Sequence, residues 1–67
     1  MNFKEKLVYV RAYLNLTQAQ LAKELNVSFE TINRWESGKY NPSRKAIYAF
    51  DIFCKKNNII FEEEDKA

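Results

Sequence analysis

Cysteine and histidine are nearly missing from this 67-residue chain, which has one cysteine and no histidine. One cysteine cannot form a disulfide within the chain, and it cannot complete a zinc site without partners. We therefore expect no metal and no cofactor, and the reduced cytoplasm is the compartment that fits best. We also expect no enzyme, because no histidine is available to activate Cys54 as a nucleophile.

Glycine and proline are equally rare, with one of each. The chain has no apolar run near the roughly 18 residues that a membrane-spanning helix needs. The opening MNFKEKL lacks the apolar region of a signal peptide. We therefore expect no membrane association. So few helix breakers favour helices with short connections, and the length allows one small domain.

Positive charge is in modest excess but unevenly placed. The net charge is +2, from 11 basic and 9 acidic residues, and the stretch EEEDK at 62–66 alone carries four acids and one lysine. The remaining chain therefore has ten basic and five acidic residues. A basic body favours a polyanionic partner. A merely solvated surface with a charged end is the alternative.

Helix-capping residues precede four apolar stretches, and they are Asn2, Thr17, Ser28 and the group Asn41-Pro42-Ser43. Glu5 and Gln20 follow the first two at the spacing of a capping box, in which side chain and backbone bond reciprocally. Asn26, which tolerates positive φ, and Gly38 are expected to end the second and third helices. The fourth is expected to break at 57–58.

Apolar residues at helical spacing indicate which faces are buried. They are Phe3, Leu7, Val10 and Leu14; Leu21, Ala22 and Leu25; Ile32 and Trp35; and Ala46, Ile47, Phe50, Phe53 and Cys54. The pattern predicts an all-α fold, a compact bundle of four to five helices. We expect residues 1–58 to form the domain, followed by a short apolar segment and acidic tail at 59–67.

The segment from Gln18 to Ser37 has the layout of a helix-turn-helix, with a small Ala22 where two helices cross and a permissive Asn26 in the turn. With the following Gly38-Lys39, the run LTQAQLAKELNVSFETINRWESGKYNPS resembles the phage repressor and Cro group, the XRE-type helix-turn-helix regulators. The resemblance covers about residues 3–56. It departs at Asn26, where many members have glycine.

The resemblance implies that the third helix, about residues 28–37, lies in the DNA major groove. Its outward residues would then read bases: Phe29, Glu30, Asn33 and Arg34. These residue types suit a thymine methyl, cytosine, adenine and guanine, respectively. The alternative is a bland surface in which Glu30 and Arg34 form only an i,i+4 ion pair.

Phosphate contacts are expected to flank the reading helix, since they fix its register. The candidates are Gln18, Ser28, Thr31, Lys39, Tyr40 and Arg44. Members of the family often pair an arginine of the first helix with the glutamate after the tryptophan. That resemblance implies a structural ion pair between Arg11 and Glu36.

The resulting hypothesis is a sequence-specific regulator of double-stranded DNA, a repressor from a bacterium or phage. Two alternatives stay open: an antitoxin-like module that binds a toxin protein and represses its own operon, and a controller of a restriction–modification system. Family members usually bind DNA in pairs, so we expect a homodimer on DNA. The candidate dimer residues are Ile59, Ile60 and Phe61, and the alternative is that these three only cap the core.

Overall fold

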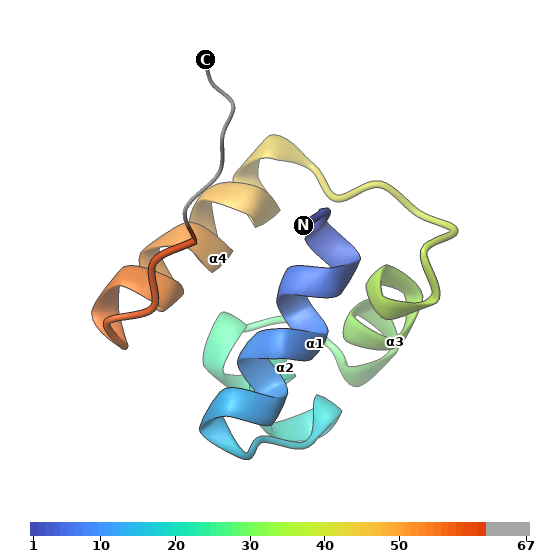
Figure 1. The fold of residues 1–67 in the computed structure, drawn as a ribbon. Coiled ribbons are helices and arrows are strands. Elements are labelled where there is room, and N and C mark those ends of the chain that lie inside the picture. The colour runs from blue at the N-terminus through green and yellow to red at the C-terminus, as the bar shows by residue number, and fades with distance from the viewer. Residues whose placement is uncertain (62–67) are drawn as a thin grey trace.

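Four α-helices make up the regular structure of the chain, whose computed structural model describes residues 1–61. Their bounds are α1 Phe3–Leu14, α2 Gln18–Leu25, α3 Phe29–Ser37 and α4 Arg44–Lys56 (Figure 1). No strand and no fifth helix occur within the described residues. The prediction of an all-α helical bundle is confirmed. The acidic residues 62–65 lie outside the described part of the chain.

The first two helices begin with the predicted capping boxes. Asn2 Oδ1 accepts the Glu5 backbone N–H at 2.8 Å, and Glu5 Oε1 accepts the Asn2 backbone N–H at 3.1 Å. Thr17 and Gln20 make the same reciprocal pair at 3.0 and 2.8 Å. Because each pair satisfies backbone donors that have no partner inside the helix, the starting residue of each helix is fixed locally.

The helix ends use residues that tolerate left-handed backbone. Asn15 and Asn26 follow α1 and α2 with φ of 58° and 59°, and Gly38 follows α3 with φ of 79°. Asn26 thus supplies the sharp turn between α2 and α3, at a position where helices most often use glycine. α4 starts one residue after its cap, Ser43, so Pro42 lies before the helix rather than in its first turn.

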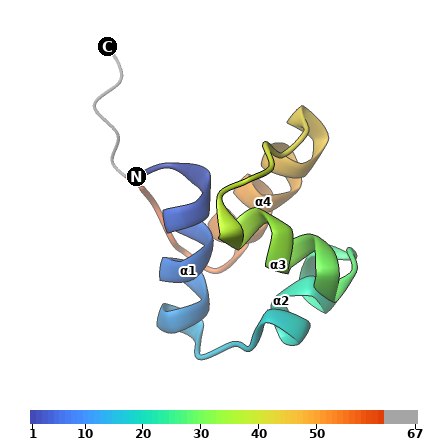
Figure 2. The ribbon, with the colours of Figure 1, turned by 90° about the vertical axis from the view of Figure 1, so that its right-hand side faces the viewer.

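The core lies where α3 meets α1 and α2, and α4 packs against α2. Leu7, Leu21 and Ile32, one from each of the first three helices, are fully buried. Figure 2 shows α2 and α3 as neighbours, with α1 beside α3. Replacing such a fully buried leucine with alanine costs about 2–5 kcal/mol in general, which is a large part of the stability of so small a domain.

Ile47 departs from the predicted core face. It is 46% exposed and borders an open hollow of about 220 Å³, which Phe3, Lys6 and Phe61 also line. Periodicity along α4 places Ile47 in line with buried Cys54, two turns away. The prediction was wrong because burial also depends on which part of the helix its neighbours cover, and this part remains open.

Candidate DNA interface

One face of α3 is in the core and the opposite face is in solvent. Ile32 is fully buried and Trp35 is 9% exposed, so these two side chains fix the rotation of the helix about its axis. The side chains predicted to read bases, Phe29, Glu30, Asn33 and Arg34, are all exposed, as is Ser37 at the end of the helix. In Figure 2 α3 runs across the front of the molecule, with no other helix covering it. The helix therefore presents a free polar and aromatic surface.

Asn33 is held by a chain of hydrogen bonds that leads into the protein. Its Nδ2 donates to Gln18 Oε1 at 3.4 Å, and Gln18 Nε2 donates to Glu36 Oε1 at 2.9 Å. Gln18 is the first residue of α2, so this side chain joins the start of one helix to the middle and end of the next. Both the oxygen and the nitrogen of the Gln18 side-chain amide form hydrogen bonds. This fixes the orientation of Gln18, and with it the side from which Asn33 is held.

Glu36 is also the partner of Arg11, and the two form a bidentate ion pair. Arg11 Nε lies 2.7 Å from Glu36 Oε2, and Arg11 Nη2 donates to Glu36 Oε1 at 3.0 Å. Arg11 Nη1 donates to the carbonyl oxygen of Leu16 at 3.1 Å. Both guanidinium edges are therefore engaged, and the pair joins α1 to α3 and to the loop before α2.

The two ionisable groups of this pair respond to the same contact. The hydrogen bond that Arg11 donates to Glu36 raises the pKa of Arg11, and the partial burial that would lower this pKa is the weaker influence. Burial alone would raise the pKa of Glu36, but hydrogen bonds from Arg11 and Gln18, with the charge of Arg11, bring that pKa below its usual range. Both groups are thus held in their charged forms.

Arg34 contacts an aromatic ring rather than the carboxylate one turn before it. Its guanidinium carbon lies 5.6 Å from the centroid of the Tyr40 ring, within the range of a cation–π contact. Within residues 1–61 no ion pair joins Glu30 to Arg34. The i,i+4 pair considered from the sequence does not form, and Glu30 stays exposed.

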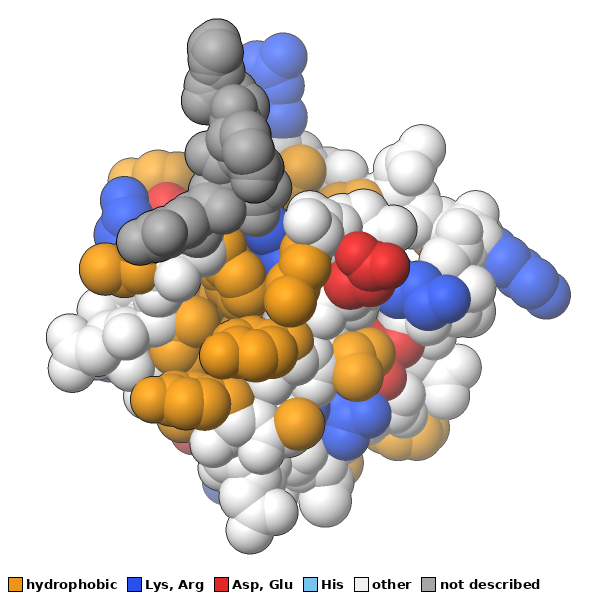
Figure 3. Space-filling view, viewed as in Figure 1, with side chains coloured by type: hydrophobic (Ala, Val, Ile, Leu, Met, Phe, Trp, Pro, Cys, Tyr) orange, Lys and Arg blue, Asp and Glu red, His pale blue; other side chains and the backbone are white. Residues whose placement is uncertain are grey.

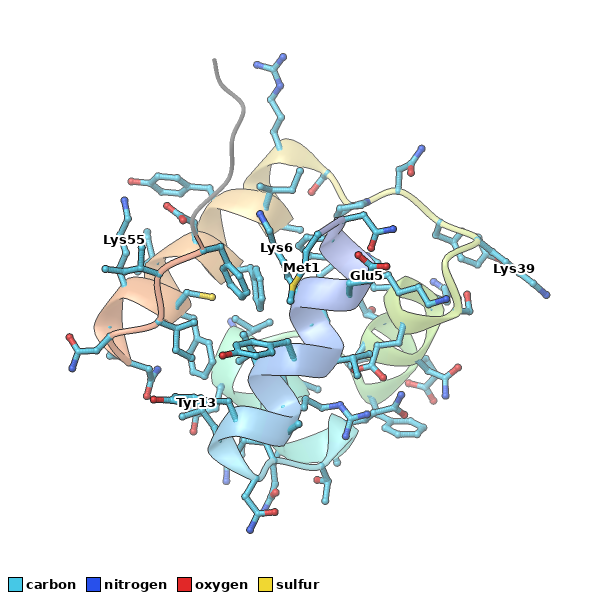
Figure 4. The ribbon with its side chains drawn as sticks, viewed as in Figure 1. Met1, Glu5, Lys6, Tyr13, Lys39 and Lys55 are labelled. Atoms are coloured by element: carbon cyan, nitrogen blue, oxygen red, sulfur yellow. The ribbon has the colours of Figure 1, made fainter. Side chains whose placement is uncertain are left out.

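Four of the six candidate phosphate contacts form two groups, one at each end of α3. At its start, the Ser28 hydroxyl accepts the Thr31 backbone N–H at 3.1 Å and lies 2.8 Å from the Thr31 hydroxyl. At its end, Lys39 points away from the body of the protein (Figure 4), with Tyr40 beside it in the chain. Arg44 is separate from both, since it opens α4 on the far side of the loop.

Lys4 joins the second group, and sequence analysis missed it. Its side chain lies over Gly38, with Cδ 3.3 Å from the position that a Cβ of residue 38 would occupy. The lysine thus adds positive charge beside the loop that carries Lys39. No local signal identifies this contact, because it joins residues far apart in the sequence.

The candidate dimer residues separate in the structure. Ile59 is 6% exposed and belongs to the core, whereas Ile60 is 80% exposed. Phe61 is half-buried and meets the Tyr9 ring edge-on, with 5.6 Å between ring centroids. Ile59 is therefore not available to a partner. Its backbone N–H donates to Cys54 O at 2.8 Å, which turns the chain back over the core.

Exposed apolar side chains gather on the side of the molecule that carries α1 and α4 (Figure 3). Tyr9 and Tyr13 stack one helical turn apart on α1, with centroids separated by 6.0 Å. They are 43% and 63% exposed, and Tyr13 projects from α1 toward the end of α4 (Figure 4). We call Tyr9, Tyr13, Ile60 and Phe61 the apolar face.

Cys54 is a buried thiol of the core. Burial is the main cause that raises its pKa to about 11, which makes it a poor nucleophile.

The described residues contain no cluster of His, Cys, Asp or Glu placed to hold a metal ion. None of the four helices has both the length and the hydropathy to span a bilayer.

Comparison with known proteins places this arrangement in a family. A helix-turn-helix family model matches residues 9–55. An uncharacterized HTH-type transcriptional regulator of Methanocaldococcus jannaschii is 46% identical over 65 residues, which is 94% of this chain and 98% of that protein. No solved structure matches the chain significantly.

Two bacterial relatives are longer than this chain. The HTH-type transcriptional activator BcrR of Enterococcus faecalis is 45% identical over 79% of this chain but only 26% of its own length. The HTH-type transcriptional regulator DicA of Escherichia coli is 36% identical over 92% of this chain and 47% of its own length. The chain thus spans less than half the length of each of these two relatives. It belongs to the XRE-type helix-turn-helix family of DNA-binding transcriptional regulators.

Proposed function

We propose that this protein represses transcription by reading a specific duplex sequence with α3 in the major groove. The observation that carries the proposal is the division of α3. Ile32 and Trp35 are buried, whereas Phe29 and three polar side chains face solvent on an uncovered helix. The major groove admits a single α-helix and offers a distinct set of donors and acceptors at each base pair.

The polar residues on this face have the groups that base edges require. Asn33 can pair with adenine through both atoms of its amide, Arg34 with guanine, and Glu30 can accept from cytosine N4. Phe29, at 47% exposure, supplies an apolar surface for a thymine methyl group. Repression needs only that the bound domain occupy DNA that another protein must use.

We assign contacts with the DNA phosphate backbone, which would position the protein on the duplex, to groups at both ends of α3. At the start of α3, Ser28 and Thr31 contact each other, and Gln18 opens α2. The loop after α3 carries Lys39, and Lys4 of α1 lies over Gly38 in the same loop. Phosphate contacts of this kind set the register of a reading helix without reading sequence themselves.

The protein is further proposed to bind its operator as a homodimer through the apolar face. One domain covers only a few base pairs, and two reading helices about 34 Å apart would meet the same groove one turn later. Ile60, at 80% exposure, and the stacked tyrosines provide an apolar surface outside the core. A protein partner of another kind, as in an antitoxin, is the second candidate, and the same face favours it.

Selection from random duplex DNA tests the proposed function. The expected result is one enriched motif, whose affinity falls by about a hundredfold between 50 and 200 mM salt if four phosphates are contacted. Lys39→Ala should reduce this salt dependence. Lys55→Ala is the matched control, because Lys55 lies on the other side of the molecule (Figure 4) and pairs with Asp51 at 3.3 Å.

Two outcomes would contradict the proposal. One is the absence of any enriched motif, and the other is binding that ignores salt. Co-purification of a second, different chain with no DNA selection would instead support the protein-interaction alternative.

A further inference from the structure

Tyr40 has a position that the phosphate role does not explain. It lies in the loop between α3 and α4, and its ring stands 5.6 Å from the guanidinium carbon of Arg34. Both side chains are exposed, and Tyr40 is 55% exposed. An exposed arginine has many rotamers, so contact with one ring favours a small part of its range.

The loop is tied back to the residue that the ring contacts. The Ser37 hydroxyl donates to the carbonyl oxygen of Arg34 at 2.6 Å, and the Lys39 backbone N–H donates to the same hydroxyl at 3.2 Å. Gly38 N–H donates to Trp35 O at 3.2 Å. The backbone one residue before Tyr40 is therefore connected to the backbone of Arg34 through a single side chain.

A guanidinium that lies over a ring keeps its hydrogen-bonding edge available. The cation–π contact uses the face of the group, whereas guanine O6 and N7 are read by the N–H groups at its edge. Ring contact and base contact are thus compatible. Restricting the arginine before binding reduces the conformational entropy lost when it meets the base.

We infer that Tyr40 is a positioning residue for Arg34, and that it sharpens the preference for the base pair that Arg34 reads. This inference rests on the proposed function. It assigns Tyr40 to specificity, whereas a phosphate contact through the tyrosine hydroxyl would stabilise binding to every sequence alike.

Two substitutions separate these roles. Tyr40→Phe keeps the ring and removes the hydroxyl, and Tyr40→Leu removes the ring. The inference expects Tyr40→Phe to keep the base preference of the parent. It expects Tyr40→Leu to reduce the preference at one base pair by about two- to fivefold, the equivalent of an exposed cation–π contact. Preferences at the other positions should not change.

The experiment is a competition between the selected duplex and its single-base variants, measured with the full chain. Arg34→Ala first identifies the base pair in question, as the one whose preference it removes. In the Arg34→Ala background, Tyr40→Leu should then have no further effect at that base pair, since nothing remains to be positioned. Circular dichroism of each variant checks folding, which the exposed loop position should leave intact.

The inference is overturned if Tyr40→Leu weakens all duplexes equally, if Tyr40→Phe behaves like Tyr40→Leu, or if Tyr40→Leu keeps its effect without Arg34. It is also overturned if Arg34→Ala removes no base preference. Failure of the proposed function is distinguishable, because the parent protein would then select no motif at all, and the inference would fall with it.

Discussion

The outer face of α3 and the apolar face are both exposed, but their side chains are held differently. On α3, Asn33 and Arg34 each meet one specific partner, Gln18 and Tyr40. On the apolar face, Tyr9 and Tyr13 stack on each other and Ile60 contacts mainly solvent. Directed polar groups suit base edges, whereas apolar area attracts without direction.

This difference fits the proposed division of roles between the two faces of a very small domain. A surface that reads sequence needs fixed donors and acceptors, because each base pair is recognised by geometry. A surface that pairs with another chain needs apolar area and a complementary shape. Substitutions on either face should therefore affect different measurements, and the ion pair that supports α3 should affect stability.

The largest effect is expected at Glu36, which receives hydrogen bonds from Arg11 and Gln18. Glu36→Ala leaves the Arg11 guanidinium partly buried and unpaired. We expect a loss of about 2–3 kcal/mol in the free energy of unfolding, less than for a fully buried pair because Arg11 is partly exposed. Urea denaturation followed by Trp35 fluorescence measures it.

The control for this substitution is Glu24→Ala, at an exposed position of α2. A change within about 0.5 kcal/mol is expected there. Equal losses in the two variants would show that the Arg11–Glu36 pair contributes nothing particular to α3.

The second effect separates a reading residue from a positioning cation. Arg34→Ala is expected to cost about 1–3 kcal/mol at one base pair and to relax the preference there. Lys39→Ala should weaken binding to all sequences alike and reduce the salt slope by about 1. Fluorescence anisotropy on a set of single-base duplex variants measures both. Exchanged profiles would reverse these two assignments.

The third effect concerns the apolar face. Ile60→Glu places a charge at the position of the most exposed apolar side chain of the described residues. It should abolish the cooperative binding of two copies to DNA, which corresponds to a loss of roughly 1–3 kcal/mol of coupling free energy between the copies. Sedimentation of parent and variant, with and without a palindromic site, measures it. Ile60→Ala, which adds no charge, should weaken pairing less. A folded Ile60→Glu protein that still loads two copies as tightly would place the dimer surface elsewhere.

The smallest effect is a dependence on pH. The pKa of Glu36 is lower in the folded protein than its ordinary value of 4.5. At a pH between the folded and the ordinary pKa, the unfolded chain therefore binds more protons than the folded one. The stabilisation is therefore complete above the ordinary value and is lost as the pH falls through the lowered one. Glu36→Gln should flatten this part of the profile of unfolding free energy against pH. An unchanged profile would show that another carboxylate is responsible.

The helices could be predicted from the sequence because their signals are local. Asn2 with Glu5, and Thr17 with Gln20, need only three residues to specify a helix start. Asn26 and Gly38 end helices through their own backbone preferences. Ile47 could not be placed in this way, because its exposure depends on how far α1 and Phe61 extend over α4.

The site was predictable only as a set of residue types. Spacing identified the outward residues of α3 but not their partners. The i,i+4 spacing that suggested an ion pair between Glu30 and Arg34 considers only neighbours within one helix. Tyr40 instead reaches Arg34 from a loop whose path depends on Gly38 and Ser37. The contacts of Lys4 with Gly38 and of Gln18 with Glu36 likewise join distant parts of the chain, and they exist only once the helices have packed.

The most direct test of the division between the two faces is nuclear magnetic resonance of the ¹⁵N-labelled chain during titration with a duplex that carries one half-site. One half-site excludes pairing on DNA, so shifts report DNA contact alone. We expect the largest shifts at residues 29–34, with smaller ones at Gln18 and Lys39 and none at Tyr9, Tyr13 or Ile60. Shifts centred on Tyr9, Tyr13 and Ile60, with α3 unchanged, would contradict the assignment of α3 as the reading helix.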